Sequence, residues 1–379
     1  GYFMVPRTIA PMLSMLDGTR NPDALRTGFL LRTGIQLDSS QVDAFIKSLD
    51  DAFLLDNQRF QGAIAKVMDN YHAGPFRPSS LAGSAYPNNG DELREAFDVY
   101  CSNANADGGG HVLKDGDGGS KRIAGLISPH IDYKRGWRTY AETWQPAQKA
   151  VEDAELIILL GTDHSGSPGK LTLTRQDYAT PWGQLPTDTS LVDGLVEILG
   201  EDGAFQEEVH HIGEHSVELA SVWLHYFAGG KPKRMLPILC GVDENLVEKG
   251  AETNGVLQDA LSFLADVVAE QNTLVVAAGD LSHVGPAFSD SLPLDLAGKA
   301  RIRTSDEEWL EVACTGSSGR LAEHMRSQGD ATRICGASPI RYMLAILPET
   351  RGEVVAYAQC PADEQFGSLV SIAGVLFTE

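Results

Sequence analysis

Three short apolar runs, each followed at once by polar residues, constrain this chain more than any other feature of its sequence. The three junctions are Ile123–Ile127 before Ser128-Pro129-His130, Leu156–Leu160 before Gly161-Thr162-Asp163-His164, and Leu274–Ala278 before Gly279-Asp280-Leu281-Ser282-His283. Buried strands that alternate with helical patterns predict an α/β fold with a largely parallel central sheet. Because such sheets bind ligands beyond the carboxyl ends of their strands, we expect the three histidines and Asp280 to share one crevice.

Two further segments carry candidate functional residues. His215 and Glu218 are three residues apart in a predicted helix and therefore share one face of it. Such a pair can bind a metal, relay a proton or form a simple capping arrangement. We expect both side chains to contact substrate or orient a ligand without binding a metal. Cys335 precedes a helix predicted from Pro339 onward, and the helix dipole is expected to lower the pKa of its thiol.

The donor atoms of these residues indicate which metals they suit. Two imidazoles and a thiolate, from His130, His164 and Cys335, favour iron, copper or zinc over magnesium or calcium. Asp280 and His283 are expected to orient these ligands or to move a proton on a bound substrate. The chain has no GxxxxGK phosphate loop and no GxGxxG after a strand, so a nucleotide cofactor is not expected.

Composition excludes several classes of function. The 379 residues include 30 basic and 52 acidic side chains, which give a formal net charge of −22. A surface this acidic repels phosphate backbones, so nucleic acid is not an expected partner. Apolar runs stay far below the roughly 20 residues of a membrane span, so no membrane partner is expected. Five cysteines without a CxxC pair favour reduced thiols and a cytoplasmic location.

The first 75 residues differ in pattern from the remainder. Asn21 and Pro22 predict the start of one helix, and Ser39 or Ser40 is expected to cap a second. We interpret residues 1–75 as a small winged-helix-like domain without a DNA-binding role, or as a packing appendage, and residues 76–379 as the α/β domain. The Gly/Asp-rich segment 103–119 is predicted to be a surface loop and not a calcium-binding EF-hand.

Eight short stretches, in a fixed order, resemble the MEMO family. The whole chain is similar to the long bacterial form of this family, AmmeMemoRadiSam system protein B, which has an additional N-terminal winged-helix-like segment. The matching stretches are Leu81-Ala82-Gly83-Ser84-Ala85-Tyr86-Pro87, Ser128-Pro129-His130, Leu160-Gly161-Thr162-Asp163-His164, Tyr178-Ala179-Thr180-Pro181-Trp182-Gly183, Glu214-His215-Ser216-Val217-Glu218, Leu236-Pro237-Ile238-Leu239-Cys240-Gly241, Gly279-Asp280-Leu281-Ser282-His283, and Cys335-Gly336.

The resemblance implies a domain like the class III extradiol dioxygenases, which contain non-haem iron. It also implies a set of site residues, and it is the main reason to include Cys335 among them. By motif the implied residues are His130, His164 and Cys335 for the metal, with Asp280 and His283 beside it. Where the family often has a second histidine this chain has Ser165, and Asp132 replaces a small residue, which adds an acid expected to meet substrate at the pocket mouth.

Three functions follow as hypotheses. The first is a metal-binding protein with redox or dioxygenase-like activity on a small substrate, with iron as the expected ion and copper or zinc as alternatives. The second is a non-enzymatic protein whose pocket binds a peptide or a partner, and the family resemblance implies radical-SAM and AMMECR-type proteins as partners. The third is a zinc hydrolase in which Asp280 or His283 would deprotonate a metal-bound water.

Overall fold

The computed structural model describes residues 3–106, 122–243, 246, 255–347 and 349–379 of the chain. Two compact units are present, Gly1–Ala73 and Gly74–Glu379, and their boundary lies two residues before the predicted one. The described residues contain no helix that is both long and apolar enough to cross a membrane. Of the predicted loop at 103–119, residues 103–106 form the end of a helix, and the rest lies outside the described residues.

The N-terminal unit is helical. Its elements are η1 (Ala10–Met15), α1 (Pro22–Thr33), α2 (Ser39–Asp51) and α3 (Gln58–Ala73). Asn21 caps α1 as predicted, whereas α2 is capped by Asp38, which forms a capping box with Gln41. No strand occurs between residues 3 and 73. The winged-helix prediction is therefore not confirmed, because a wing is a β-hairpin.

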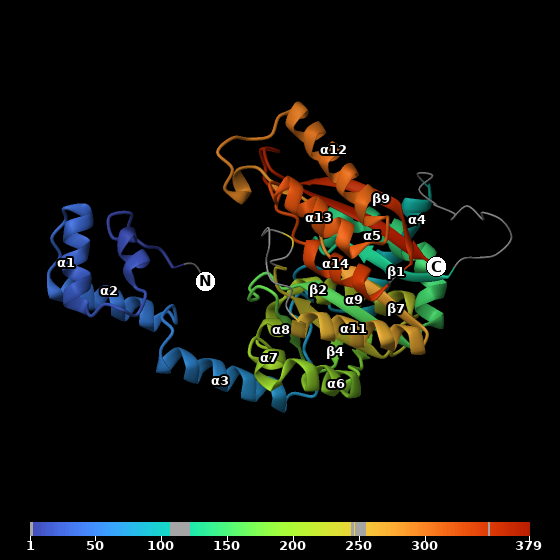
Figure 1. Cartoon of the computed structure of the whole chain (residues 1–379), viewed down its shortest axis with the longest axis horizontal. Helices are drawn as coiled ribbons and strands as arrows, with labels where there is room; N and C mark the ends of the chain where they lie inside the picture. Colours follow the sequence, from blue (N-terminus) through green and yellow to red (C-terminus); the bar gives the residue numbers. More distant parts are fainter. Residues whose placement is uncertain (1–2, 107–121, 244–245, 247–254, 348) are drawn as a thin grey trace. The chain divides into compact units, whose positions relative to one another are not determined.

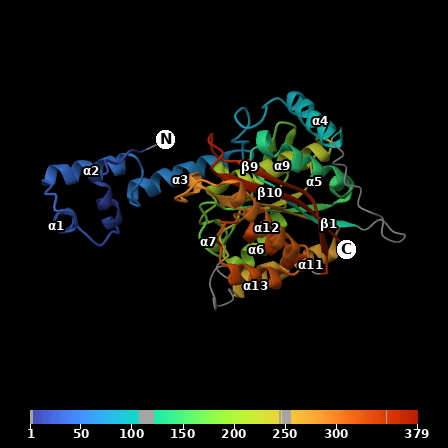
Figure 2. The ribbon, with the colours of Figure 1, turned by 90° about the horizontal axis from the view of Figure 1, so that it is seen from above.

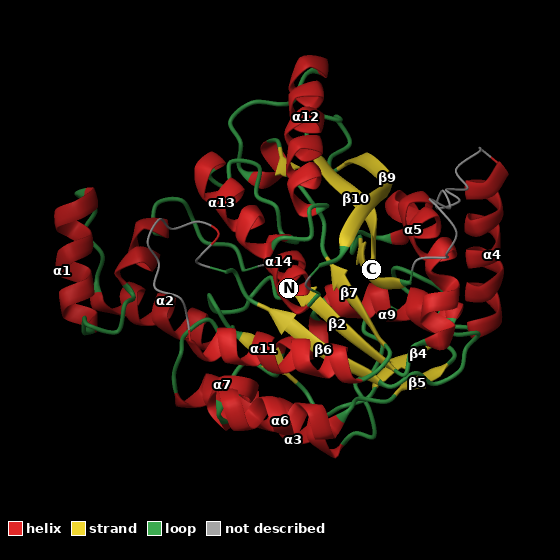
Figure 3. Cartoon of the chain, turned by 45° about the vertical axis from the view of Figure 1, so that its right-hand side comes forward, coloured by secondary structure: helices red, strands yellow, loops and turns green. Residues whose placement is uncertain are grey.

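The second unit is built around an eight-stranded sheet with the order β3-β6-β2-β7-β1-β10-β8, and β9 pairs with β10. Its strands are β1 (Ile123–Ser128), β2 (Leu156–Thr162), β3 (Leu171–Leu173), β6 (Met235–Cys240), β7 (Thr273–Ala278), β8 (His283–Val284), β9 (Arg351–Pro361) and β10 (Leu369–Thr378). Strands β6, β2, β7 and β1 are parallel neighbours, and the flanking strands are antiparallel. The predicted α/β fold is confirmed, with the parallel strands at the centre (Figures 1 and 3).

Helices cover both faces of this sheet (Figure 2). Every residue of β1, β2 and β7 is buried, as expected for parallel strands packed on two sides. Along β2, Ile157 and Leu159 pack with α4, α5 and α9, whereas Ile158 and Leu160 pack with the helices of the opposite face. The three apolar runs of the sequence are therefore neighbouring strands, and their carboxyl ends lie at one edge.

The remaining elements connect these layers. They are α4 (Gly90–Ala106), α5 (Tyr133–Asp153), the hairpin β4 (Tyr178–Thr180) and β5 (Gly183–Leu185), α6 (Thr189–Leu199), α7 (Glu201–Phe205), α8 (His210–Gly213), α9 (His215–Phe227), α11 (Gly255–Glu270), η2 (Pro286–Phe288), α12 (Leu296–Ala313), α13 (Ser318–Gln328) and α14 (Ala337–Ile346).

Glycines allow two helix starts to approach the sheet edge. A Cβ at Gly336, just before α14, would lie 2.7 Å from the Cα of Gly279, the residue after β7. A Cβ at Gly161 of β2 would lie 2.6 Å from the hydroxyl oxygen of Ser216 in the first turn of α9. Side chains at these positions would separate the elements, so glycine brings both helix starts to the ends of the strands.

Candidate metal centre

A pocket of about 560 Å³ lies at the carboxyl ends of the central strands. Its wall includes six of the predicted site residues, namely Asp132, His130, His164, His215, Asp280 and His283. Cys335 contacts one of these, His130, from the end of the loop before α14. Of the eight predicted site residues, only Glu218 is separated from this group.

One side of the centre consists of His130, Asp280 and Cys335, and we call it the thiol side. The Nδ1–H of His130 donates to the carbonyl of Ala278 at 3.1 Å, which leaves its Nε2 with a free lone pair. This Nε2 lies 3.2 Å from the Sγ of Cys335. Asp280 Oδ1 accepts the backbone N–H of His130 at 2.8 Å, so strands β1 and β7 are joined directly beside the pocket.

The opposite side consists of His164, Glu214 and His215, and we call it the imidazole side. Glu214 binds the Nδ1 atoms of both histidines, each at 3.0 Å, through different carboxylate oxygens. The two rings stack with centroids 4.8 Å apart, and each lies 5.1 Å from the ring of His130. A carboxylate that accepts the Nδ1–H of an imidazole directs its Nε2 outward, which is the usual arrangement behind a metal-binding histidine.

The donor set fits a transition metal. Candidate ligand atoms of His130, His164 and Cys335 all lie within 4.8 Å of one another. Ligands of an ion bonded at about 2.0–2.3 Å are separated by distances of this order. The centre therefore could hold a metal ion with two nitrogen ligands and one sulfur ligand, a set that suits iron, copper and zinc. A second overlapping group, His164, Glu214 and His215, also satisfies the distance criterion.

Burial dominates the pKa values on the thiol side. It raises the pKa of Asp280 to about 6, even though the hydrogen bond from the backbone of His130 opposes the shift. Burial, with the charge of Asp280, also raises the pKa of the Cys335 thiol well above its ordinary value. The expectation that the helix dipole lowers this pKa is therefore wrong for the metal-free protein. A bound metal ion would itself deprotonate the thiol.

Charge dominates on the imidazole side. Burial alone would raise the pKa of Glu214, yet hydrogen bonds from His164 and His215 hold it well below its usual range. Burial alone would lower the pKa of His215, whereas the hydrogen bond and charge of Glu214 raise it above its usual value. Glu214 is thus ionised and holds both rings in place. Sequence reasoning missed its role, although its position as the cap of α9 was a usable signal.

Glu218 has a different role from the one predicted. Its side chain is completely buried and forms an ion pair with the guanidinium of Arg77, whose side chain is also completely buried. The same carboxylate accepts the backbone N–H groups of Ser80 and Leu81, at 3.0 and 2.9 Å, and the hydroxyl of Tyr86 at 2.5 Å. The structure does not bring Glu218 to the pocket wall, because its oxygens are occupied by this internal network, and of the two predicted roles only the orientation of other residues agrees with this position.

Arg77 links this network to the imidazole side. Its Nε donates to the carbonyl of His211 at 2.7 Å, and its Nη2 donates to the carbonyl of Glu214 at 3.1 Å. Leu81, which follows in the same segment, lines the pocket. Arg77 and Glu218 therefore position one wall of the pocket and the start of α9. They lie 141 residues apart in sequence, and no local pattern points to their pairing.

Asp132 and His283 lie on the pocket wall with defined partners. Asp132 caps α5 and forms an ion pair with Arg135 at 2.6 Å, and both residues line the pocket. His283 places its Nδ1 near the carbonyls of Leu281 and Arg333, at 3.0 and 3.2 Å. Both positions agree with contact to a ligand, and neither residue belongs to the group of candidate metal donors.

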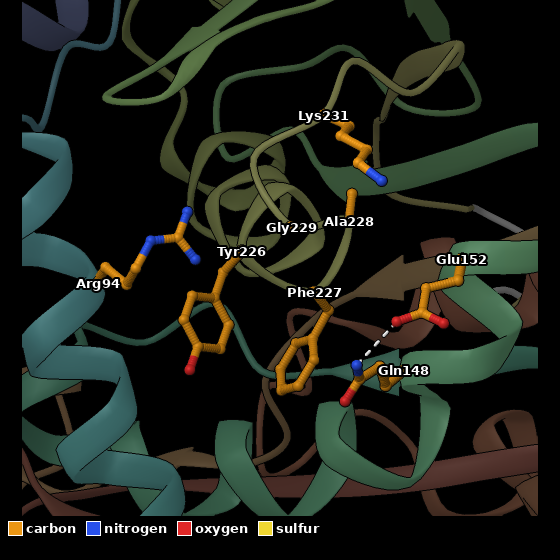
Figure 4. A pocket seen from close by; sticks show the side chains of 8 residues that line it. All are labelled: Arg94, Gln148, Glu152, Tyr226, Phe227, Ala228, Gly229 and Lys231. Carbon is orange, nitrogen blue, oxygen red and sulfur yellow. Dashed lines mark hydrogen bonds between the residues drawn. The ribbon is translucent and has the colours of Figure 1, made fainter.

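A second pocket, of about 330 Å³, lies at the end of α9 (Figure 4). Its wall includes Arg94, Tyr226 and Lys231, together with Gln148, which donates to Glu152 at 2.8 Å. It contains none of the residues of the candidate metal centre. The predicted site residues therefore line the pocket at the sheet edge and not this one.

Comparison with known proteins identifies relatives of this chain. A family model described as Memo-like protein matches residues 77–376. A MEMO1 family protein of Aquifex aeolicus (strain VF5) is 25% identical over 374 residues, which cover 97% of this chain and 90% of the relative. A MEMO1 family protein of Thermus thermophilus is 27% identical over 333 residues, which cover 86% of this chain and 90% of the relative.

Proposed function

Because the chain belongs to the Memo-like protein family, we propose that it binds a divalent transition-metal ion and carries out redox or dioxygenase-like chemistry on a small molecule. The ligands in this proposal are His130, His164 and Cys335. The observation that carries it is the convergence of two imidazoles and a thiol, from three distant parts of the chain, beside one pocket. Iron is the proposed ion, and copper is the closest alternative for this donor set.

Outer hydrogen bonds support the assignment of the two histidines. The carbonyl of Ala278 and the carboxylate of Glu214 each occupy the Nδ1 of one ring, His130 or His164. Both Nε2 atoms are then available as neutral ligands, which metal binding requires. In the thiol of Cys335 the centre has a soft donor, which favours iron and copper over magnesium and calcium.

The pocket residues have separate tasks in this proposal. A bound iron or copper ion would supply a reversible change of oxidation state. Apolar side chains, among them Leu81, Leu219 and Phe288, form part of the pocket wall and exclude water from a bound substrate. His215 and His283 present imidazoles to the same cavity and can orient a substrate or hold a proton at a ring nitrogen. Asp280 Oδ2 lies 3.9 Å from the Nε2 of His130, so this carboxylate can hold a proton beside that ligand.

Elemental analysis of the anaerobically purified chain tests the proposal. We expect iron or copper at one equivalent in this centre, with a large loss in His130→Ala and Cys335→Ser. Cys101→Ser is the matched control, since Cys101 is also a partly buried free cysteine but is not in the candidate group. Zinc alone would favour hydrolysis, and an absence of metal from freshly purified protein would favour a binding role for the pocket.

A further inference from the structure

Asp163, Glu207 and His210 form a further group of candidate metal donors, and none of them lines the pocket of the first centre. Asp163 directly precedes His164 in the sequence, yet it does not line the pocket that His164 lines. Its Oδ2 lies 2.9 Å from the Nδ1 of His210. Ligand atoms of Asp163, Glu207 and His210 all fall within 4.8 Å of one another. We propose that these three residues bind a second divalent metal ion, at a site independent of the first.

The charges at this group favour a cation. The side chain of Asp163 is only 1% exposed, and Glu207 is half-buried. Within the described part of the chain, no lysine or arginine forms an ion pair with either carboxylate, and His210 is the one basic partner of Asp163. Two carboxylates near one imidazole retain net negative charge even when the imidazole is protonated. A divalent ion removes this repulsion, which burial makes more costly.

The carboxylates are held in place by the loop after β2. Asp163 Oδ1 accepts the backbone N–H of Ser165 at 3.1 Å. The other oxygen, Oδ2, contacts His210. Glu207 accepts the backbone N–H and the hydroxyl of Ser167. A Cβ at Gly166 would lie 2.6 Å from the Cγ of Asp163, so the loop wraps closely around that carboxylate. The donors are therefore preorganised before an ion arrives.

The two centres differ in the metals that they prefer. The group at Asp163 offers two oxygens and one nitrogen, whereas the first centre offers two nitrogens and one sulfur. Carboxylate oxygens suit manganese, whereas copper(I) prefers thiolate. Manganese(II) is thus the probe that separates this group from the thiol-containing centre.

Binding of manganese(II) alone to the metal-free full-length chain tests this inference, measured by electron paramagnetic resonance and by elemental analysis after equilibrium dialysis. We expect one manganese per chain, with affinity at least about tenfold lower in Glu207→Gln and in His210→Gln. His130→Ala combined with Cys335→Ser should retain the manganese. His324→Gln, which changes a histidine on α13, is the matched control.

The outcomes separate this site from the first one. Wild-type affinity in both Glu207→Gln and His210→Gln would overturn the inference and leave Asp163 and His210 as a simple ion pair. Loss of manganese in the variant lacking His130 and Cys335 would also overturn it, because the ion would then occupy the first centre. Manganese that is retained without His130 and Cys335 but lost in Glu207→Gln and His210→Gln, in a protein without iron or copper, would contradict the proposed function and support this second site. Thermal unfolding of Glu207→Gln, which keeps the size of the side chain, checks that the fold survives.

Discussion

The two sides of the candidate metal centre are held by different forces. On the thiol side, His130 and Asp280 are almost fully buried, and backbone groups at strand ends orient them. On the imidazole side, the side chains of His164 and His215 are 37% and 40% exposed, and a single carboxylate, Glu214, holds both. The difference indicates that packing fixes one half of the centre, whereas a network of charges on α9 fixes the other half.

The largest effect is expected from breaking the buried ion pair between Arg77 and Glu218, which belongs to α9. Glu218→Gln leaves the guanidinium of Arg77 buried without a charged partner, and we expect the free energy of unfolding to fall by about 3–5 kcal/mol. Chemical denaturation measures this change. Asp153→Asn, which removes a solvent-exposed partner of Lys149, is the control and should leave the free energy of unfolding almost unchanged.

The same change sharpens the comparison between the two sides. Because Arg77 also donates to the carbonyl of Glu214, a disturbed pair should shift the NMR resonances of His164 and His215 more than those of His130. Equal shifts on both sides would show that the imidazole side has no special dependence on this pair. A variant with Arg77→Met and Glu218→Leu together should regain stability relative to Glu218→Gln, since no unpaired charge remains.

Cys335→Ser is the next largest change and affects metal affinity. Loss of the sulfur ligand should weaken iron or copper binding more than about a hundredfold, since soft ions prefer thiolate. The melting temperature of the metal-free protein should change little, because serine has nearly the same size as cysteine and can keep the contact with the carbonyl of Asp280. Competition with a chelator measures the affinity. Unchanged metal content with a large loss of stability would assign Cys335 to packing alone.

Glu214→Gln should have an intermediate effect. An amide keeps a hydrogen bond to one ring but cannot accept from both with full charge, so we expect metal affinity to fall by about 10–100-fold. Isothermal titration calorimetry with the metal ion measures this loss of affinity. Spectroscopy of the bound ion should show an altered contribution from His164, which Glu214 orients, and an unaltered contribution from His130. Wild-type affinity would mean that the exposed side of the centre is dispensable for metal binding.

The smallest effect is expected in the N-terminal unit. Asp38→Ala removes the cap of α2 and its capping box, which should lower the melting temperature of the N-terminal unit slightly. Metal content and affinity should stay as in the wild type, because all candidate ligands belong to the second unit. Thermal unfolding and elemental analysis of the same sample provide both readings. A change in metal content would show that the two units are coupled.

Much of the centre could be predicted from sequence because it depends on strand ends. The apolar runs before His130, His164 and Asp280 identify β1, β2 and β7, and parallel strands carry their following residues to the same edge. Nothing local predicts the partner of Glu218, because its neighbour in space is Arg77, far away in sequence. Helical spacing placed Glu218 beside His215, yet one side chain lines the pocket and the other is buried beneath it.

The pKa of Cys335 shows a second limit of sequence reasoning. A position just before a helix predicts a lowered pKa from the dipole. Whether burial outweighs the dipole depends on what packs around the thiol. Here the thiol lies against Asp280 at the end of the sheet, and burial raises its pKa. The unconfirmed winged-helix prediction has a similar cause. The sequence pattern of α1 and α2 is shared by many small helical units and does not by itself predict the β-hairpin of a wing. The helix α3 occupies the segment where a hairpin would follow.

The strand order has a consequence for when the centre can form during synthesis. Strand β7 lies between β1 and β2, although more than a hundred residues separate β1 and β2 from it in the chain. His130 and His164 thus reach their final separation only after β7 has inserted, and the cysteine ligand follows later still. Such long-range pairing is slow, so a ribosome-bound fragment that ends before Cys335 lacks the complete ligand set. A metal ion held by all three candidate ligands would therefore bind after β7 has inserted, whereas β9 and β10 follow Cys335 in the chain.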